Sequence, residues 1–157
     1  MKFSFIRFIT LLYLFFLVVS CDQQRVFESN KAIGAKGWDM NESIDFLIDV
    51  PDTSKSYHLY LNTRNVGDYK FSNLYLFINT YTPSGIVQRD TAEIILAEES
   101  GKWLGNGIGD LYAKQTLFVR GFKFKELGEY RFEIMQAMRI NPLLGIEDIG
   151  MRLEYAQ

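Results

Sequence analysis

The sequence predicts an all-β fold: an antiparallel, jelly-roll-like β-sandwich that follows a cleaved signal peptide and a short N-terminal tether. Three observations lead to this prediction. The chain has 13 Phe and 9 Tyr among 157 residues, and aromatic side chains suit the half-buried surface of a sheet. Short runs of alternating polar and apolar residues are separated by turn residues. Some intervals between these runs are long enough to cross from one sheet to another.

The first twenty residues have the three parts of an export signal. Lys2 and Arg7 form a basic start, residues 8–19 are almost entirely apolar, and the small residue Ser20 stands at the cleavage edge. The apolar stretch is too short for a membrane-spanning helix, which needs about 20 residues. We therefore expect this segment to direct export and to be removed.

Cys21 is the only cysteine of the chain, and it directly follows Val18-Val19-Ser20. This order fits a bacterial lipobox, in which the thiol is acylated and becomes the first residue of the mature protein, whereas an A-x-A-like signal peptidase site is missing. The alternative is an ordinary signal peptide with a coincidental cysteine. Lipidation of Cys21 would leave no thiol for disulfides, zinc sites or cysteine catalysis. The mature protein is expected to be membrane-attached through its lipid and otherwise soluble.

The domain organisation follows from these boundaries. We expect residues 1–20 to be the signal peptide, residues 21–37 the lipidated N-terminus and tether, and residues 38–157 one sandwich domain. The tether would join the fold at Val26-Phe27 or near Trp38. The net charge of −2 becomes more negative when the basic signal segment is lost, which argues against nucleic acid as a partner.

About seven strands are expected in the mature chain. Polar and apolar residues alternate most clearly in the first run, where Phe46, Ile48 and Val50 share one face and Asp45 and Asp49 the other. The expected strands are residues 44–50, 57–64, 71–81, 86–96, 116–124, 129–138 and 151–155.

Two strands and two intervals carry further expectations. Residues 71–81 are apolar on both faces, which predicts a central strand that is covered on both sides or lines a groove. The polar residues 88–91 interrupt the fourth strand and indicate a bulge or a corner. Residues 98–114 and 141–149 are interpreted as ordered loops between the sheets.

No pattern of catalytic residues stands out. His58 is the only histidine and shares its strand face with Asn62 and Arg64, so it is interpreted as an exposed strand residue. The segment Gly105-Asn106-Gly107-Ile108-Gly109 fits neither a Walker loop nor a dinucleotide fingerprint, and is interpreted as a tight glycine loop. We therefore expect no enzyme activity, no cofactor, no metal and no small-molecule substrate.

Two weaker binding hypotheses rest on acidic and aromatic residues. Neighbouring carboxylates such as Glu98-Glu99 and Glu147-Asp148 could help to bind calcium, and a carboxylate pair beside a groove could hydrolyse glycosides, although the spacing selects no pair. Aromatic residues could form a stacking platform for sugars, although core packing is the more common role of such residues. The candidate platform residues are Tyr60, Tyr69, Phe71, Tyr75, Tyr81 and Tyr112.

Sequence motifs along the mature chain resemble those of the GldH gliding-motility lipoproteins. The most specific are Gly101-Lys102-Trp103-Leu104-Gly105 and Gln136-Ala137-Met138-Arg139. The others are Cys21-Asp22, Val26-Phe27, Trp38, Arg64 through Asp68-Tyr69, Ser72-Asn73-Leu74, Asp90-Thr91, Leu96-Ala97, Gly128-Glu129-Tyr130, Leu144-Gly145-Ile146 and Asp148-Ile149-Gly150.

The resemblance implies a lipoprotein that is needed for surface gliding and associated with type IX secretion, without known catalysis. It assigns no catalytic residue. We interpret the motif residues as a structural or interaction set in which Trp38 and Trp103 plug the core and Asp90-Thr91 locks a turn. The set comprises Trp38, Asp90, Thr91, Gly101, Lys102, Trp103, Gly105, Met138 and Arg139.

The leading functional prediction is a noncatalytic lipoprotein of the cell envelope, expected at the outer membrane. Its partners would be the membrane, through the lipid, and envelope proteins of the gliding or secretion machinery. The alternative is a surface glycan-binding β-sandwich module, and a hydrolase is the third hypothesis. The fold class alone does not separate these hypotheses, because sandwiches serve all three functions.

Overall fold

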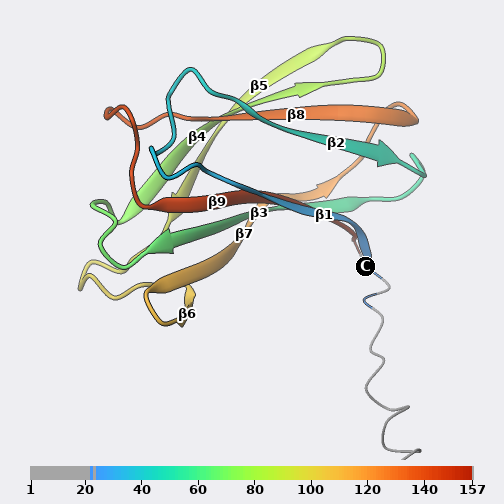
Figure 1. Cartoon of the computed structure of the whole chain (residues 1–157). Coiled ribbons are helices and arrows are strands. Elements are labelled where there is room, and N and C mark those ends of the chain that lie inside the picture. Colours follow the sequence, from blue (N-terminus) through green and yellow to red (C-terminus); the bar gives the residue numbers. More distant parts are fainter. Residues whose placement is uncertain (1–21, 23, 157) are drawn as a thin grey trace, which may run out of the picture.

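The structure, a computed structural model, describes residues 22 and 24–156 and forms a sandwich of two antiparallel sheets (Figure 1). The predicted all-β sandwich is confirmed: the described residues contain strands and no helix, and hence no helix that could span a membrane. The predicted signal peptide and the predicted lipidation site, Cys21, lie outside the described residues. The strands are β1 (Arg25–Ala32), β2 (Ile44–Val50), β3 (Tyr57–Val66), β4 (Asn73–Tyr81), β5 (Val87–Ile95), β6 (Asn106–Ile108), β7 (Leu111–Phe122), β8 (Gly128–Gln136) and β9 (Ile146–Tyr155).

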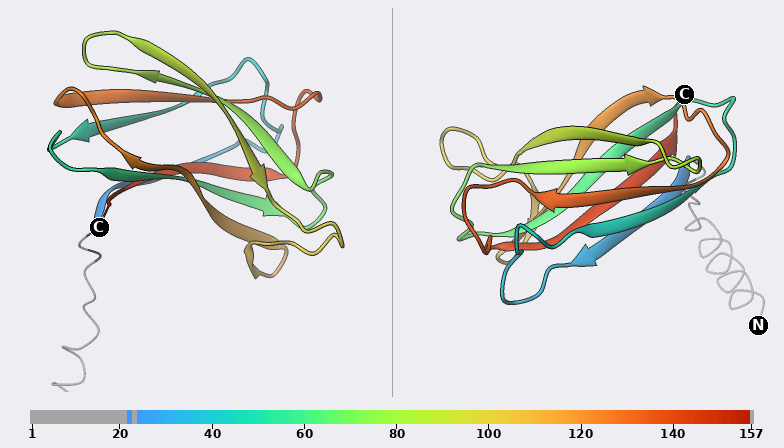
Figure 2. Two further views of the ribbon diagram at one scale, coloured as in Figure 1. Left: turned by 180° about the vertical axis from the view of Figure 1, so that it is seen from behind. Right: turned by 90° about the horizontal axis from the view of Figure 1, so that it is seen from above.

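The strand order is that of a jelly roll. The five-stranded sheet has the order β1-β9-β3-β7-β6, and the four-stranded sheet has the order β2-β8-β4-β5. With the short β6 set aside, the other eight strands alternate between the two sheets except for β4 and β5, which are neighbours both in the chain and in one sheet. Figure 2 shows the two layers from behind and from above. Most connections therefore cross from sheet to sheet at the two ends of the sandwich.

The core lies between the inner faces of the two sheets. The alternation predicted for residues 44–50 is observed, since Phe46, Ile48 and Val50 are at most 2% exposed. Opposite them, Met151 and Leu153 of β9 are fully buried. Aromatic and branched side chains from both sheets thus fill one continuous core.

Residues 25–32 of the predicted tether form strand β1, so the chain joins the fold at Val26-Phe27, the earlier of the two expected junctions. This strand pairs antiparallel with β9, and Val26 and Phe27 pack against the core. An edge strand with few buried residues lacks the alternation that reveals a strand in a sequence, so residues 25–32 resembled a polar spacer.

The details of β4 to β7 also differ from the predictions. Residues 88–91 form no bulge or corner: β5 pairs in regular register with β4 along its whole length. Strand β4 is central in its sheet, as predicted, but it is covered on one face only, since Tyr75 and Phe77 are 38% and 49% exposed. On that open face Phe77 and Asn79 line a groove, which was the other expectation for this strand. The expected loop over residues 98–114 contains β6 and the start of β7, which raises the strand number above seven.

The sandwich has two distinct ends. At the N-terminal end, β1 begins at Arg25, next to the end of β9 at Glu154 and Tyr155. At the opposite end, which we call the distal end, lie residues 33–43, 67–72, 96–105 and 137–145 (Figure 1). The point at which the chain enters the fold is thus one strand length away from these loops.

If β1 is part of the folded body, Phe27→Ala should destabilise the protein. Phe27 is half-buried against the core, and loss of its ring should lower the free energy of unfolding by about 2 kcal/mol. Urea denaturation measures this change, with Lys36→Ala, at an exposed position outside the strands, as the control. Equal stability of both variants would show that residues 25–32 are a tether in solution.

Candidate functional site

Most of the residues singled out by sequence motifs lie together at the distal end. Trp38, Gly101, Lys102, Trp103, Gly105, Met138 and Arg139 belong to the distal loops, which come from four separate parts of the chain. Asp90 and Thr91 are the exceptions, because they lie in the middle of β5. Their predicted role as a turn lock is therefore wrong, and β5 is considered separately below.

Trp38 joins two of the distal loops. Its side chain is 1% exposed, and its indole Nε1 donates a hydrogen bond of 2.9 Å to the Glu42 carbonyl. Its backbone pairs with that of Leu143 through two hydrogen bonds. Close packing between the loops leaves no room for a side chain at Gly37, where a Cβ would lie 2.8 Å from the Leu143 carbonyl oxygen. The two loops are thus held as one unit.

Trp103 supports the neighbouring part of the distal end. Its half-buried ring packs between Tyr69 and Tyr112, with centroid distances of 6.5 and 5.7 Å. The chain then passes β7 so closely that a Cβ at Gly105 would lie 2.9 Å from the Ala113 carbonyl oxygen. Tyr69 is 5% exposed, and burial raises the pKa of its hydroxyl, which donates to the Asn73 carbonyl. This aromatic cluster packs beneath the distal loops and supports them.

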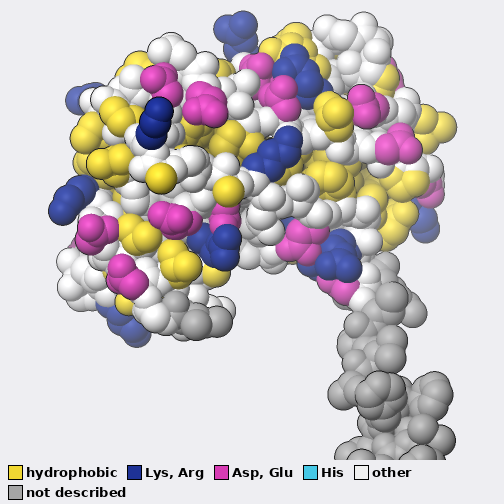
Figure 3. All heavy atoms as spheres, viewed as in Figure 1, with side chains coloured by type: hydrophobic (Ala, Val, Ile, Leu, Met, Phe, Trp, Pro, Cys, Tyr) yellow, Lys and Arg dark blue, Asp and Glu magenta, His cyan; other side chains and the backbone are white. Residues whose placement is uncertain are grey.

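Above this support, apolar side chains face outward. Met40, Leu104, Ile140 and Leu144 are 41–61% exposed. A shallow cavity of about 250 Å³ lies beside Ile140 and Leu144 and is lined mainly by apolar atoms. The exposed residues Lys102 and Arg139 add positive charge. Figure 3 shows apolar, cationic and acidic side chains next to one another at this end of the molecule. We call the six residues named here the distal surface.

At the other end, Arg152 ties the start of the chain to the sandwich. Its guanidinium pairs with Asp22, Glu28 and Glu154, and its side chain is only 13% exposed. A hydrogen bond from Arg152 lowers the pKa of Asp22. Burial raises the pKa of Glu28, but hydrogen bonds from Arg152 and Arg25 outweigh this effect and leave it below its ordinary value. Residue 22, next to the predicted lipidation site, is thus bound to β9.

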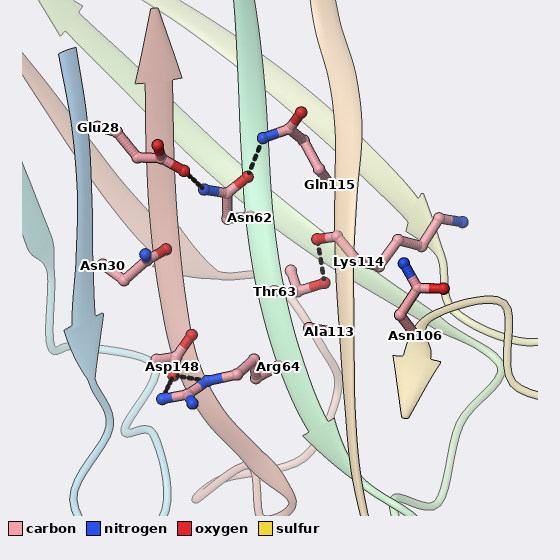
Figure 4. Close-up of a pocket in the computed structure, with 10 residues that line it drawn as sticks. All are labelled: Glu28, Asn30, Asn62, Thr63, Arg64, Asn106, Ala113, Lys114, Gln115 and Asp148. Carbon is pink, nitrogen blue, oxygen red and sulfur yellow. Dashed lines mark hydrogen bonds and ion pairs between the residues drawn. The ribbon is translucent and has the colours of Figure 1, made fainter. Parts of the chain in front are cut away.

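A polar groove crosses the outer face of the five-stranded sheet (Figure 4). Asn62 donates to Glu28 and accepts from Gln115, and Arg64 pairs with Asp148. The Asp148 side chain is only 4% exposed, so Arg64 balances a buried charge. Amide groups of this kind can bind sugar hydroxyls, but no aromatic ring is among the residues that line the groove.

The candidate sugar platform is not assembled on one surface. Tyr69 is buried, and Tyr112 lies against Trp103. Tyr60 belongs to the five-stranded sheet, whereas Tyr75 and Tyr81 belong to the four-stranded sheet, and Tyr81 is covered by the Arg131 guanidinium at 3.7 Å. The glycan hypothesis gains no geometric support from these rings.

The other chemical hypotheses find no cluster in the described residues. No group of three or more acidic, histidine or cysteine side chains comes together there as a metal site would require. His58 is half-buried, and its Nδ1 accepts a hydrogen bond from the Gly121 backbone N–H. The glycine segment after Gly105 forms the short β6 and the turn into β7.

Sequence reasoning missed Arg152 and Gly145. Arg152 occupies a strand position whose neighbours alternate regularly, so nothing in the sequence marked its carboxylate partners. At Gly145, φ is +87° and a Cβ would lie 3.1 Å from the Tyr69 ring. Gly145 is part of the Leu-Gly-Ile motif, but the reason why a glycine is needed there, the close approach to Tyr69, depends on the fold.

The chain is similar to lipoproteins of one family. The family model described as GldH lipoprotein matches residues 25–153. A relative from Christiangramia forsetii, described as a gliding motility lipoprotein GldH homolog, is 36% identical, with 94% of this chain and 95% of the relative covered. The gliding motility lipoprotein GldH of Flavobacterium johnsoniae is also 36% identical, with 88% of this chain and 89% of that protein covered.

The ion pairs of Arg152 predict that the variant Arg152→Gln is less stable than wild type by an amount that depends on pH. Carboxylates with lowered pKa values stabilise the fold above their ordinary pKa, near 4, and this contribution disappears as the pH falls through the lowered values. Arg152→Gln should therefore be less stable than wild type at pH 7, and the difference should shrink below about pH 4. Urea titrations across this range measure it, with Lys36→Gln, at an exposed position outside the strands, as control. A difference that is constant with pH would contradict the assigned pairs.

Proposed function

The chain belongs to the GldH lipoprotein family, and on this premise we propose that it is a noncatalytic, lipid-anchored envelope protein that contributes to gliding motility, type IX protein secretion or both. In this proposal it acts through contacts with other envelope proteins. The relatives carry the name of gliding motility lipoproteins and not of enzymes, which supports the absence of catalysis.

The observation that carries the proposal is the separation of the two ends. Asp22 and β1 fix the start of the folded body at one end, and the exposed apolar residues of the distal surface lie at the other. Exposed apolar side chains that are held on packed loops and interspersed with charged groups are typical of a protein contact surface. A lipid on Cys21 would leave this surface pointing away from the membrane.

The anchor itself is part of the proposal. Acylation of Cys21 would attach the protein to an envelope membrane, with the outer membrane as the proposed location. Because Arg152 holds Asp22, the acylated residue would follow the body without a long spacer, and the body would stay near the bilayer. The partners would then be envelope proteins that reach the distal surface.

Cys21→Ala should release the protein from the membrane fraction and abolish function. In a strain that lacks the native gene, the wild-type protein should restore colony spreading or secretion of cargo, and the variant should not. Intact-mass analysis of the wild-type protein should show the added acyl groups. A Cys21→Ala protein that still sediments with membranes and restores the phenotype would disprove the anchoring step.

Leu144→Glu should impair function without loss of anchoring or stability. Leu144 is 61% exposed at the distal end, so a charge there should disrupt a protein contact but leave the fold intact. Leu127→Glu is the matched control, because Leu127 is 62% exposed and lies between β7 and β8 at the N-terminal end. Colony spreading at equal membrane levels of both variants provides the readout. Spreading that is unaffected by Leu144→Glu, or equally reduced by Leu127→Glu, would remove the distal surface from the mechanism.

A further inference from the structure

Strand β5 is a long, regular and uncovered sheet edge. It is the outermost strand of the four-stranded sheet, next to β4 on one side only (Figure 2, right). All nine residues pair with β4 without a bulge, and the strand contains neither Pro nor Lys. Proteins commonly protect edge strands with bulges, prolines or lysines, because an open edge can pair with another chain. β5 therefore retains the capacity to accept a strand.

The hydrogen-bond pattern shows which backbone groups of β5 are free. Bonds from Thr82 N–H to the Ile86 carbonyl and from Leu96 N–H to the Ser72 carbonyl fix the ladder, so even-numbered residues of β5 bond to β4. The odd-numbered residues direct their N–H and C=O groups to the open side. These residues are Val87, Arg89, Thr91, Glu93 and Ile95, and within the described part of the chain only the Ile95 carbonyl among their outward groups already accepts a hydrogen bond, from Lys114 Nζ.

A cleft opens beside this edge, between the two sheets, and is lined by apolar side chains on the β7 side and by polar ones, Thr80, Gln88 and Asp90, on the side of the four-stranded sheet. It has a volume of about 350 Å³ and contains Phe118, Val119 and Phe122 of β7, which are only partly buried. The core residues Leu59 and Phe132 form its floor. Core packing is thus incomplete on this side of the sandwich, and an added side chain could fill the space.

The two edges that flank the cleft differ in their protection. On β7, Lys114 crosses to the Ile95 carbonyl of β5 and closes the distal part of the open side. On β5, the half-buried Asp90 lines the cleft, and Gln88 donates a hydrogen bond of 3.0 Å to its carboxylate. A negative charge at this position disfavours apolar strands in general and favours one with a basic residue opposite.

We propose that β5 binds an extended segment of a partner protein as an additional strand. The segment would bond to the free backbone groups around Thr91, place apolar side chains at alternate positions in the cleft, and set a basic residue against Asp90. This inference rests on the proposed function only in taking the partner to be an envelope protein. It gives Asp90-Thr91 a role in recognition.

Other occupants fit the observations less well. A second copy pairing through its own β5 would bring no basic residue to Asp90, because the only basic residue of β5, Arg89, has its side chain on the outer face of the sheet. An acyl chain could fill the apolar part of the cleft but could bond neither to the free N–H and C=O groups of β5 nor to the Asp90 carboxylate. A peptide with alternating apolar residues and one basic residue could fill the cleft, bond to the free backbone groups of β5 and pair with the Asp90 carboxylate.

Selection from a random twelve-residue peptide library on the mature lipoprotein in detergent tests the proposal. Selected peptides should have apolar residues at every second position and a basic residue among them. On binding, hydrogen exchange should slow at the amides of Arg89, Thr91 and Glu93. Thr91→Pro removes a backbone N–H that does not bond to β4. It should lower the affinity for the labelled consensus peptide by about tenfold or more.

Leu47→Pro is the matched control. The bond from Ala137 N–H to the Tyr75 carbonyl places the backbone groups of Leu47 on the open side of β2, at the other edge of the same sheet. The Leu47→Pro variant should bind the peptide with an affinity within about twofold of that of wild type. Asp90→Asn, which keeps the side-chain shape, should weaken binding several-fold. Failure to select alternating peptides, equal affinity for Thr91→Pro and wild type, or dimers that Thr91→Pro dissociates would overturn the proposal, whatever the motility phenotype.

Discussion

The pairing of β1 with β9, secured by Arg152, is the constraint on which the rest depends. It turns a segment that could have been a free spacer into part of the sandwich and holds Asp22, next to the predicted lipid site, against the fold. The three carboxylates around one guanidinium make this attachment electrostatic as well as hydrophobic. The end at which the chain enters the sandwich therefore determines which way the distal end faces.

The jelly-roll strand order determines where the other surfaces of the molecule lie. Because most connections cross between the sheets, long loops gather at the distal end, where Trp38 and Trp103 brace them and leave Leu144 and its neighbours exposed. The same order leaves β5 without a neighbour on one side. The fold thus offers two surfaces of different kind: an apolar end suited to side-chain contacts, and a strand edge suited to backbone pairing.

Sequence periodicity located the core strands because burial on one face leaves an alternating pattern, as in residues 44–50. It failed for β1, which buries few side chains, and at residues 88–91, where polar residues belong to a regular edge strand. The motifs identified Trp38 and the residues around Trp103 but not that four distant segments meet, because only the topology brings them together. Arg152 remained invisible, since its partners come from other segments of the chain.

The central claim is that the lipid holds the N-terminal end at the membrane and the distal surface away from it. Fluorophores placed at positions 127 and 144 of the acylated protein, reconstituted in vesicles that contain a headgroup quencher, test it directly. The account predicts strong quenching at position 127 and little at position 144. Equal quenching at both positions, or stronger quenching at 144, would contradict it.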